Sequence, residues 1–388
     1  MTGAMYAAIA GLRTHMQNLN VIGNNVANVN TYGYKASRSV FRTSIYTTLS
    51  GGSDGTNTVG GKNPSQIGYG ANMGSVDIDM STGNYAVTGK ATDMMIDGDG
   101  FFMVGDKTIS DGFDGSADDV NMFTSLNLTR VGNFDFKADG YLTNNDGQVV
   151  YGFLCTGIDA ATGKATFSNQ LVPIRFPGVG AKAGADGALE LKWPTTAVEG
   201  DGADANAVGK LHDALQPVAD DAPAGTEAEP WPKATFNGIT VDGKTGVISG
   251  TCAETGEQVV IGVVAIGMVT NPNGVTSMGN SYYKAGEGAG NLSVALFGGA
   301  GEDLGITYVN GELAQAPDGG DAPAPVDGLR LRKGAKNASI ISGGLEMSKT
   351  DLAQEISQMI LTQRGYQANT RIITVTDSML EELVNMKR

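Results

Sequence analysis

Apolar residues near the start of the chain recur at alternating steps of four and three positions. This spacing places one narrow stripe along a helix, as at the a and d positions of a coiled coil. It predicts a helix of about 25 residues, or roughly 40 Å. A left-handed turn at Gly33 can end that helix. The stripe consists of Met5, Ile9, Leu12, Met16 and Leu19.

The opposite face of this helix is polar but nearly uncharged. Asn24, Asn25 and Asn28 stand where a solvent-facing helix usually carries Lys and Glu. An amide side chain can donate and accept hydrogen bonds at the same time. We therefore expect these three side chains to be buried among other polar groups.

A second helix is predicted at the other end of the chain, with a length of about 55 Å. Ser348, followed three residues later by Asp351, provides a capping pattern at its start. Gly365 lies inside the helix and should cost ~1 kcal/mol relative to Ala. Because the apolar repeat continues past Gly365, we expect another backbone to approach closely there rather than a break. The repeat consists of Leu352, Met359, Tyr366, Ile373 and Leu380, with Ile356 and Val384 at d positions and Gln363 interrupting that row.

Two interpretations fit these apolar stripes. Each helix taken singly is typical of one that buries its stripe against a globular core. As a pair at opposite ends of the chain, the helices instead indicate a coiled-coil stem. Polar residues at d positions, such as Gln363, favour an interface shared by several chains over a single dry seam. We therefore expect a self-assembling stem.

The middle of the chain changes to a period of two, which predicts strands. Val76, Ile78 and Met80 alternate with acidic residues, as in a half-buried strand. The apolar runs 94–96 and 101–104 flank a short Asp/Gly turn, which predicts a hairpin. Strands and Gly turns recur about every ten residues, a pattern typical of an antiparallel sandwich or barrel. The predicted fold class is α+β, with β-rich domains and a stem of paired terminal helices.

The domain organisation follows from these changes of pattern. Residues 1–35 and 348–388 are expected to form the helical assembly domain, and 36–74 an extended connector. Residues 75–156 and 250–347 should form the β-rich core. The Ala/Gly/Asp/Pro-rich segment within 157–249 is typical of an inserted outer β domain, and 312–328 of a surface excursion.

Charge is unevenly spread over the 388 residues, whose net charge is −15. Residues 1–53 contain no acid and four cations, while 345–388 hold six acids and five cations. The remainder therefore carries −15 − 4 + 1 = −18. An acidic middle argues against nucleic-acid binding, which needs a basic surface. No apolar run approaches the ~20 residues that span a bilayer, so membrane insertion is not expected either.

The sequence contains few of the His and Cys residues that commonly form catalytic or metal sites. The chain has two histidines and two cysteines, Cys155 and Cys252, which lie 97 positions apart. Unpaired thiols are the simpler expectation, although a disulfide between them stays open. The glycine motif at 178–183 is preceded by a proline and followed by no amphipathic helix, and the Asp-rich turns lack a calcium-loop pattern. We expect no catalytic, cofactor or metal site.

Three sets of motifs resemble the bacterial flagellar hook and rod family. The first is residues 24–35, Asn-Asn-Val-Ala-Asn-Val-Asn-Thr-Tyr-Gly-Tyr-Lys, which is similar to that family's N-terminal signature. The second comprises residues 98–102, 129–134 and 139–142, which are similar to its β-domain landmarks. The third comprises residues 344–353 and 363–369, which match its closing signature. Together the resemblance covers roughly residues 1–155 and 255–388.

The resemblance implies a homopolymeric axial tube whose terminal helices line a channel. It also implies extracellular assembly, export by the flagellum's own type III apparatus without a Sec signal, and contacts with rod, hook-cap and hook–filament junction proteins. The insertion favours a hook subunit, with a distal rod subunit as the alternative and a secreted trimeric adhesin as an unrelated one. The expected self-assembly residues are the two stripes with Asn24, Asn25, Asn28, Gly33, Lys35, Gln363 and Gly365.

Overall fold

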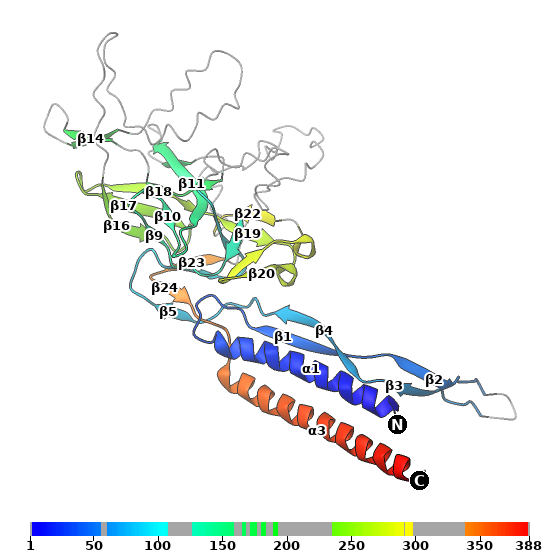
Figure 1. The fold of residues 1–388 in the computed structure, drawn as a ribbon. Helices are drawn as coiled ribbons and strands as arrows, with labels where there is room; N and C mark the ends of the chain where they lie inside the picture. The colour runs from blue at the N-terminus through cyan, green and yellow to red at the C-terminus, as the bar shows by residue number, and fades with distance from the viewer. Residues whose placement is uncertain are drawn as a thin grey trace. The chain divides into compact units, whose positions relative to one another are not determined.

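The computed structural model describes residues 2–55, 60–107, 126–158, 165–167, 171–176, 180–183, 189–192, 235–290, 292–297 and 338–386. The chain forms two compact units, one of Met1–Met80 with Ser348–Arg388 and the other of Ser81–Met347. The fold is α+β, and every strand pairing in the described ranges is antiparallel (Figure 1). The prediction of antiparallel sheets flanked by terminal helices is confirmed.

Two helices dominate the first unit. α1 spans Thr2–Ala27, and α3 spans Leu352–Asn385. Asp351 itself caps α3, because its carboxylate accepts hydrogen bonds from the backbone N–H groups of Ala353 and Gln354. The sequence instead suggested Ser348 as the cap, and that detail is wrong. The Ser348 hydroxyl donates to Thr350 in the turn before the helix.

The two helices run antiparallel and approach each other at small and amide residues (Figure 1). A Cβ at Gly11 would lie 2.5 Å from Asn369 Nδ2, and one at Gly365 would lie 2.8 Å from the ring of His15. α3 is continuous through Gly365, as expected, but the His15 side chain rather than the α1 backbone lies against this glycine. The side chains of both partners fill the space that a Cβ would need.

Polar side chains form the hydrogen bonds between α1 and α3. Asn18 Nδ2 donates to Thr362 Oγ1 at 2.9 Å, and Asn25 Nδ2 donates to Glu355 Oε1 at 3.0 Å. Among the predicted stripe residues of α3, Met359 and Ile373 are half-buried and the others are exposed. The expected coiled-coil pairing is not confirmed. The sequence pattern located the apolar face of each helix, but periodicity does not show which face meets the partner.

Four strands complete this unit. β1 (Ser37–Thr43) pairs with β4 (Ala71–Ile78), and β2 (Tyr46–Ser50) pairs with β3 (Ser65–Gly68). α1 packs on this ribbon through Thr14, whose hydroxyl donates to the carbonyl of Ala71 at 2.9 Å. The segment 36–74 is thus a paired ribbon rather than only a connector. The strand expected at 76–80 in the core is the end of this ribbon, because the first unit continues to Met80.

Within the described residues, the second unit is built around a 14-stranded sheet. Its main path runs β16-β17-β18-β11-β7-β8-β21-β20, with six further strands paired alongside. The strands of the path are β7 (Phe101–Gly105), β8 (Asn127–Thr129), β11 (Val149–Ile158), β16 (Phe236–Val241), β17 (Val247–Cys252), β18 (Gln258–Val264), β20 (Thr276–Gly279) and β21 (Tyr282–Lys284).

The remaining elements of this unit are short. Two 3-10 turns, η2 (Pro272–Gly274) and η3 (Glu287–Ala289), lie close to each other. β14 and β15 form a separate pair, as do β23 with β6 and β24 with β5. The strands are β5 (Tyr85–Val87), β6 (Met94–Asp97), β9 (Asp135–Phe136), β10 (Leu142–Thr143), β12 (Ala165–Phe167), β13 (Val172–Pro173), β14 (Gly180–Ala183), β15 (Leu189–Lys192), β19 (Ile266–Val269), β22 (Leu292–Ala295), β23 (Ser339–Ser342) and β24 (Gly344–Glu346).

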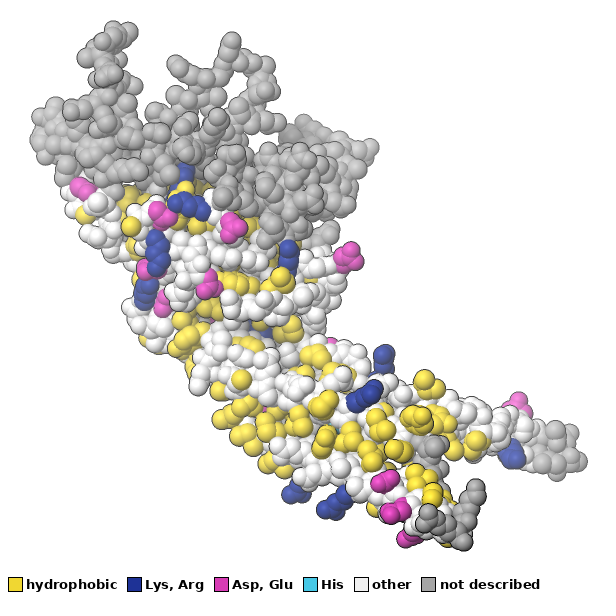
Figure 2. All heavy atoms as spheres, viewed as in Figure 1, with side chains coloured by type: hydrophobic (Ala, Val, Ile, Leu, Met, Phe, Trp, Pro, Cys, Tyr) yellow, Lys and Arg dark blue, Asp and Glu magenta, His cyan; other side chains and the backbone are white. Residues whose placement is uncertain are grey.

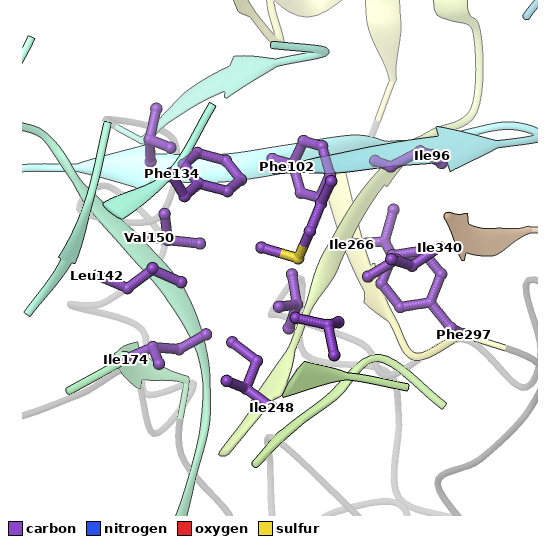
Figure 3. Packing of buried hydrophobic residues seen from close by; sticks show 14 of the residues in the cluster. Ile96, Phe102, Phe134, Leu142, Val150, Ile174, Ile248, Ile266, Phe297 and Ile340 are labelled. Atoms are coloured by element: carbon purple, nitrogen blue, oxygen red, sulfur yellow. The ribbon is translucent and has the colours of Figure 1, made fainter. Parts of the chain in front are cut away.

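The core of this unit draws on segments from its whole length (Figure 3). Val241 and Ile248 belong to the buried cluster, and β17 pairs along β18. Residues 235–249 are therefore part of the core sheet, which corrects the expected boundary of the inserted domain. Most of that insertion, and all of 312–328, lies outside the described residues.

The sequence predicted the turns of this unit correctly, but it did not predict which strands pair with each other. Gly140 and Gly147 adopt φ values of +80° and +82°, and each closes a turn between strands as expected. The hairpin expected between 94–96 and 101–104 is wrong, because β6 pairs with β23 while β7 pairs with β8, β11 and β19. Positive φ at both Gly98 and Gly100 redirects the chain instead of folding it back along β6.

A buried ion pair ties together distant parts of this unit. Arg130 Nη1 lies 3.7 Å from Glu346 Oε2, and both side chains are 1% exposed. Arg130 also donates to the carbonyls of Ile96 and Gly98, and Glu346 Oε1 accepts from the backbone N–H of Gly83 at 2.7 Å. Burial lowers the pKa of the Arg130 guanidinium, and the Glu346 carboxylate opposes that shift.

Substituting Arg130→Met should therefore destabilise the second unit strongly. The variant removes the charge that offsets a buried carboxylate, which typically costs about 3–5 kcal/mol. Lys137→Met is the matched control, because Lys137 pairs with Asp135 at the surface and such pairs contribute about 0–1 kcal/mol. Urea unfolding followed by circular dichroism measures both. If both variants lose the same small amount of unfolding free energy, Arg130 does not form a buried ion pair that stabilises this unit.

Two glycine substitutions test the helix seam. Ala is a better helix former than Gly by ~1 kcal/mol, so Gly23→Ala, which meets nothing within 4 Å, should increase protection of α1 from amide exchange. Gly365→Ala should decrease protection of both helices, because its Cβ collides with the His15 ring. Similar gains for both variants would show that the helices do not approach closely at Gly365.

Candidate self-assembly surface

The end of α1 is fixed by one buried amide. Asn25 is 1% exposed, and its Nδ2 donates to the carbonyl of Ser37 at 2.8 Å as well as to Glu355. Its Oδ1 accepts from the backbone N–H of Ser37 and from the Tyr34 hydroxyl at 3.0 Å. Burial, and then the Glu355 charge, raise the pKa of Tyr34. A single side chain thus holds α1, β1, α3 and the intervening turn.

The other signature residues shape the turn that follows. Asn28 Nδ2 donates to the carbonyl of Asn24 at 2.9 Å, and Asn24 Nδ2 donates to the Tyr34 hydroxyl at 3.2 Å. Gly33 adopts φ +67°, and the buried Lys35 Nζ donates to the carbonyl of Met80 at 3.4 Å. These residues position the helices within one chain, and their part in subunit contacts stays a prediction.

The α1 stripe faces away from both partners of that helix within the chain. Met16 is 52% exposed, and Met5 is also exposed, while Ile9, Leu12 and Leu19 are half-buried. At roughly 100° per residue, this stripe lies about a third of a turn from the seam through Gly11 and His15. Figure 2 shows apolar side chains, in yellow, along the visible face of this unit. The stripe is therefore open to another molecule.

Most of the predicted α3 stripe is exposed. Val384 is 69% exposed, and Met359 and Ile373 are half-buried. Gln363 lies exposed among the stripe residues. The remaining members are all exposed: Leu352, Ile356, Tyr366 and Leu380.

Sequence reasoning missed further apolar surface. Leu361, Ile372, Val375, Met379 and Leu383 are exposed on another face of α3, with Leu361 at 70%. Their steps of eleven, three and four fit one face of a helix and were available as a signal, but the seven-residue repeat starting at Leu352 marks a different face. The ribbon also exposes apolar side chains at Ile45, Tyr46, Leu49 and Ile67.

These surfaces are suited to packing against other proteins. Across the described ranges, no three His, Cys, Asp or Glu side chains gather closely enough to hold a metal ion. Cys155 and Cys252 are buried, and no disulfide joins them. Neither described helix has the length and apolarity needed to cross a bilayer. Contiguous exposed apolar surface of this extent marks an interaction site in a protein.

Comparison with known proteins identifies the two ends first. A family described as "Flagella basal body rod protein" matches residues 5–35, which hold most of α1 and the Asn25 turn. A second family, described as "Flagellar basal body rod FlgEFG protein C-terminal", matches residues 341–386, which hold all of α3.

Relatives align along the whole chain. It is 29% identical over 388 residues to flagellar basal-body rod protein FlgG of Bacillus subtilis, covering 100% of both chains. It is 27% identical over 465 aligned positions to flagellar hook protein FlgE of Borreliella burgdorferi, again covering 100% of both. It is 26% identical over 439 aligned positions to flagellar hook protein FlgE of Salmonella typhimurium, and the alignment covers 98% of this chain and 99% of the Salmonella protein. With family matches at both terminal helices and hook and rod relatives over its full length, the chain belongs to the family of flagellar hook and rod proteins.

Proposed function

We propose that the chain is the structural subunit of the flagellar hook, a curved hollow tube that acts as a universal joint and transmits torque from rod to filament. The observation that carries this proposal is the pair of open apolar stripes on α1 and α3, at the two family-matched ends of the chain. Relatives named hook protein that span its full length support it.

Exposed apolar surface carries a free-energy cost in water. Removing such surface from water is worth roughly 25 cal/mol per Å², and most residues of the two stripes are exposed in the single chain. Other copies of the chain can cover them. A contact that does not close on itself repeats into an open helical polymer. The acidic middle of the chain, by like-charge repulsion, would limit sticking between polymers.

A distal rod subunit is the second candidate, because the Bacillus subtilis relative carries a rod name. The long insertion expected within 157–249 favours the hook. A secreted trimeric adhesin would also bury helical stripes, but it would build no tube. As a hook subunit the protein would lie outside the cell and meet the rod, the hook cap and the hook–filament junction proteins. It would be exported through the flagellum's type III apparatus.

Deleting the coding sequence from its host tests the assignment. We expect isolated basal bodies that retain the rod and lack the hook in electron micrographs. Reintroducing a tagged chain should restore motility, and gold-labelled antibody should mark the curved segment outside the outer end of the rod. Label within the rod would show the distal rod subunit instead. Label scattered over the cell surface, with intact hooks, would overturn both flagellar assignments.

Truncating the stripes should weaken polymer formation. Met16→Ala and Tyr366→Ala should each cost about 2–5 kcal/mol per subunit if these side chains are buried in the polymer. Every 1.4 kcal/mol is tenfold in an equilibrium constant, so the critical concentration in a sedimentation assay should rise more than tenfold.

The matched controls are Gln17→Ala and Gln367→Ala, which alter exposed neighbours outside the stripes. Both controls should polymerise like the parent chain. If the stripe variants do so as well, the stripes are not subunit interfaces.

A further inference from the structure

The chain passes between its two compact units at two points, Met80–Ser81 and Met347–Ser348. Any force that the chain carries from one unit to the other must therefore enter the second unit along its first residues or its last. The structure binds these two segments to each other. β5 pairs antiparallel with β24, and Tyr85 lies opposite Glu346. The strand that enters the unit thus runs beside the strand that leaves it.

The two strands are in close contact beside the crossings. The backbone N–H of Met347 donates to the carbonyl of Asn84 at 2.8 Å, and the backbone N–H of Gly83 donates to Glu346 Oε1 at 2.7 Å. A Cβ at Gly83 would lie 2.1 Å from the carbonyl oxygen of Met347, so a glycine is needed for this approach. The entering and leaving strands are therefore held together within a few residues of both crossings.

Glu346 also connects this pair of strands to the core. Its side chain is 1% exposed, and its Oε2 lies 3.7 Å from Arg130 Nη1. Arg130 donates to the carbonyl of Ile96 at 3.2 Å and to that of Gly98 at 2.7 Å, beside the end of β6. Met94 and Ile96 of β6 belong to the buried cluster of this unit. A single buried guanidinium thus joins the crossing strands to a strand of the core.

We propose that Arg130 and Glu346 form a mechanical anchor, through which force from both chain crossings passes into the core of the second unit. Bonds that must break together resist force better than bonds that break one after another. The anchor gathers four such interactions: the ion pair, the Gly83–Glu346 hydrogen bond and the two bonds from Arg130 to carbonyls. Because the cluster is buried, these interactions are screened less than they would be in water.

This inference rests on the proposed function for its use in the cell. A subunit of a joint that transmits torque must pass force between its units, and an anchor at the crossings opposes local unfolding there. The anchor itself is a property of a single chain. It can therefore be measured without a polymer, whichever flagellar structure the chain builds.

Single-molecule pulling with optical tweezers tests the anchor. Lys349→Cys, just past the second crossing, and Lys244→Cys, in the turn between β16 and β17, carry the handles, because both lysines are exposed. The native Cys155 and Cys252 are buried. The measured quantity is the lifetime of the second unit at constant force, which reports its unfolding rate.

Removing both charges together separates the anchor from ordinary stability. Arg130→Met with Glu346→Gln leaves no charge of the pair unpaired, so this double variant should lose less unfolding free energy in urea than Arg130→Met alone. Its lifetime under force should nevertheless fall about tenfold or more, as the loss of hydrogen bonds to a charged group implies. Ile261→Val on β18 is the control for a weakened core. It should lower the unfolding free energy and leave the lifetime close to that of the parent.

Gly83→Ala tests whether the two crossings share the load. Its Cβ would collide with Met347, while the handle at position 349 pulls on the leaving strand alone. A shortened lifetime is expected, although the altered residue lies on the entering strand. Parental lifetimes for Gly83→Ala and for the double variant would overturn the anchor. An equal loss of lifetime for Ile261→Val would overturn it as well.

A test in cells separates this inference from the proposed function. Cells that carry the double variant should build hooks but stop swimming in a viscous medium, where the torque on the hook is high. Normal swimming there, despite shortened lifetimes in the tweezers, would overturn the use of the anchor in the hook. If the lifetimes fall but the chain is found outside the hook, the anchor stands and the hook assignment fails. If the chain builds hooks and the lifetimes are parental, the hook assignment stands and the anchor fails.

Discussion

The close approach of α1 and α3 is the constraint on which the rest of the helical unit depends. Gly11 and Gly365 lack the side chains that would hold the helices apart, and Asn369 and His15 occupy the space they leave. Amides supply the hydrogen bonds along the same seam, from Asn18 to Thr362 and from Asn25 to Glu355. Small and polar residues make these contacts, and most of the apolar stripe residues stay exposed in the single chain.

The separate faces of α1 and α3 relate the fold to the proposed self-assembly. One face of each helix sets the geometry of a single subunit, and the apolar faces stay open for other subunits. The Asn25 network extends the first role, since it fixes the turn and the first strand of the ribbon against both helices. A subunit arranged in this way presents defined surfaces to its neighbours, and a polymer can be built from one repeated contact. The family matches at the same two ends agree with such a role.

The sequence predicted the helices and their apolar stripes. The contacts that it did not predict are all between residues far apart in the chain. Periodicity located both helices, and the uninterrupted repeat around Gly365 correctly indicated that α3 continues through this glycine. It could not show that His15 fills that gap, because a lone histidine carries no spacing signal. The hairpin expected at 94–104 failed for a related reason: β6 pairs with β23, more than 200 residues away, and local turn residues do not encode distant strand partners.

An electron cryomicroscopy map of the assembled polymer would show which helix faces meet within a chain and which meet between chains. We expect His15 to pack against Gly365 of its own chain. We also expect Met16 and Tyr366 to pack against other chains. A map in which Met16 and Tyr366 of one chain pack against each other, or in which both face water, would contradict that expectation.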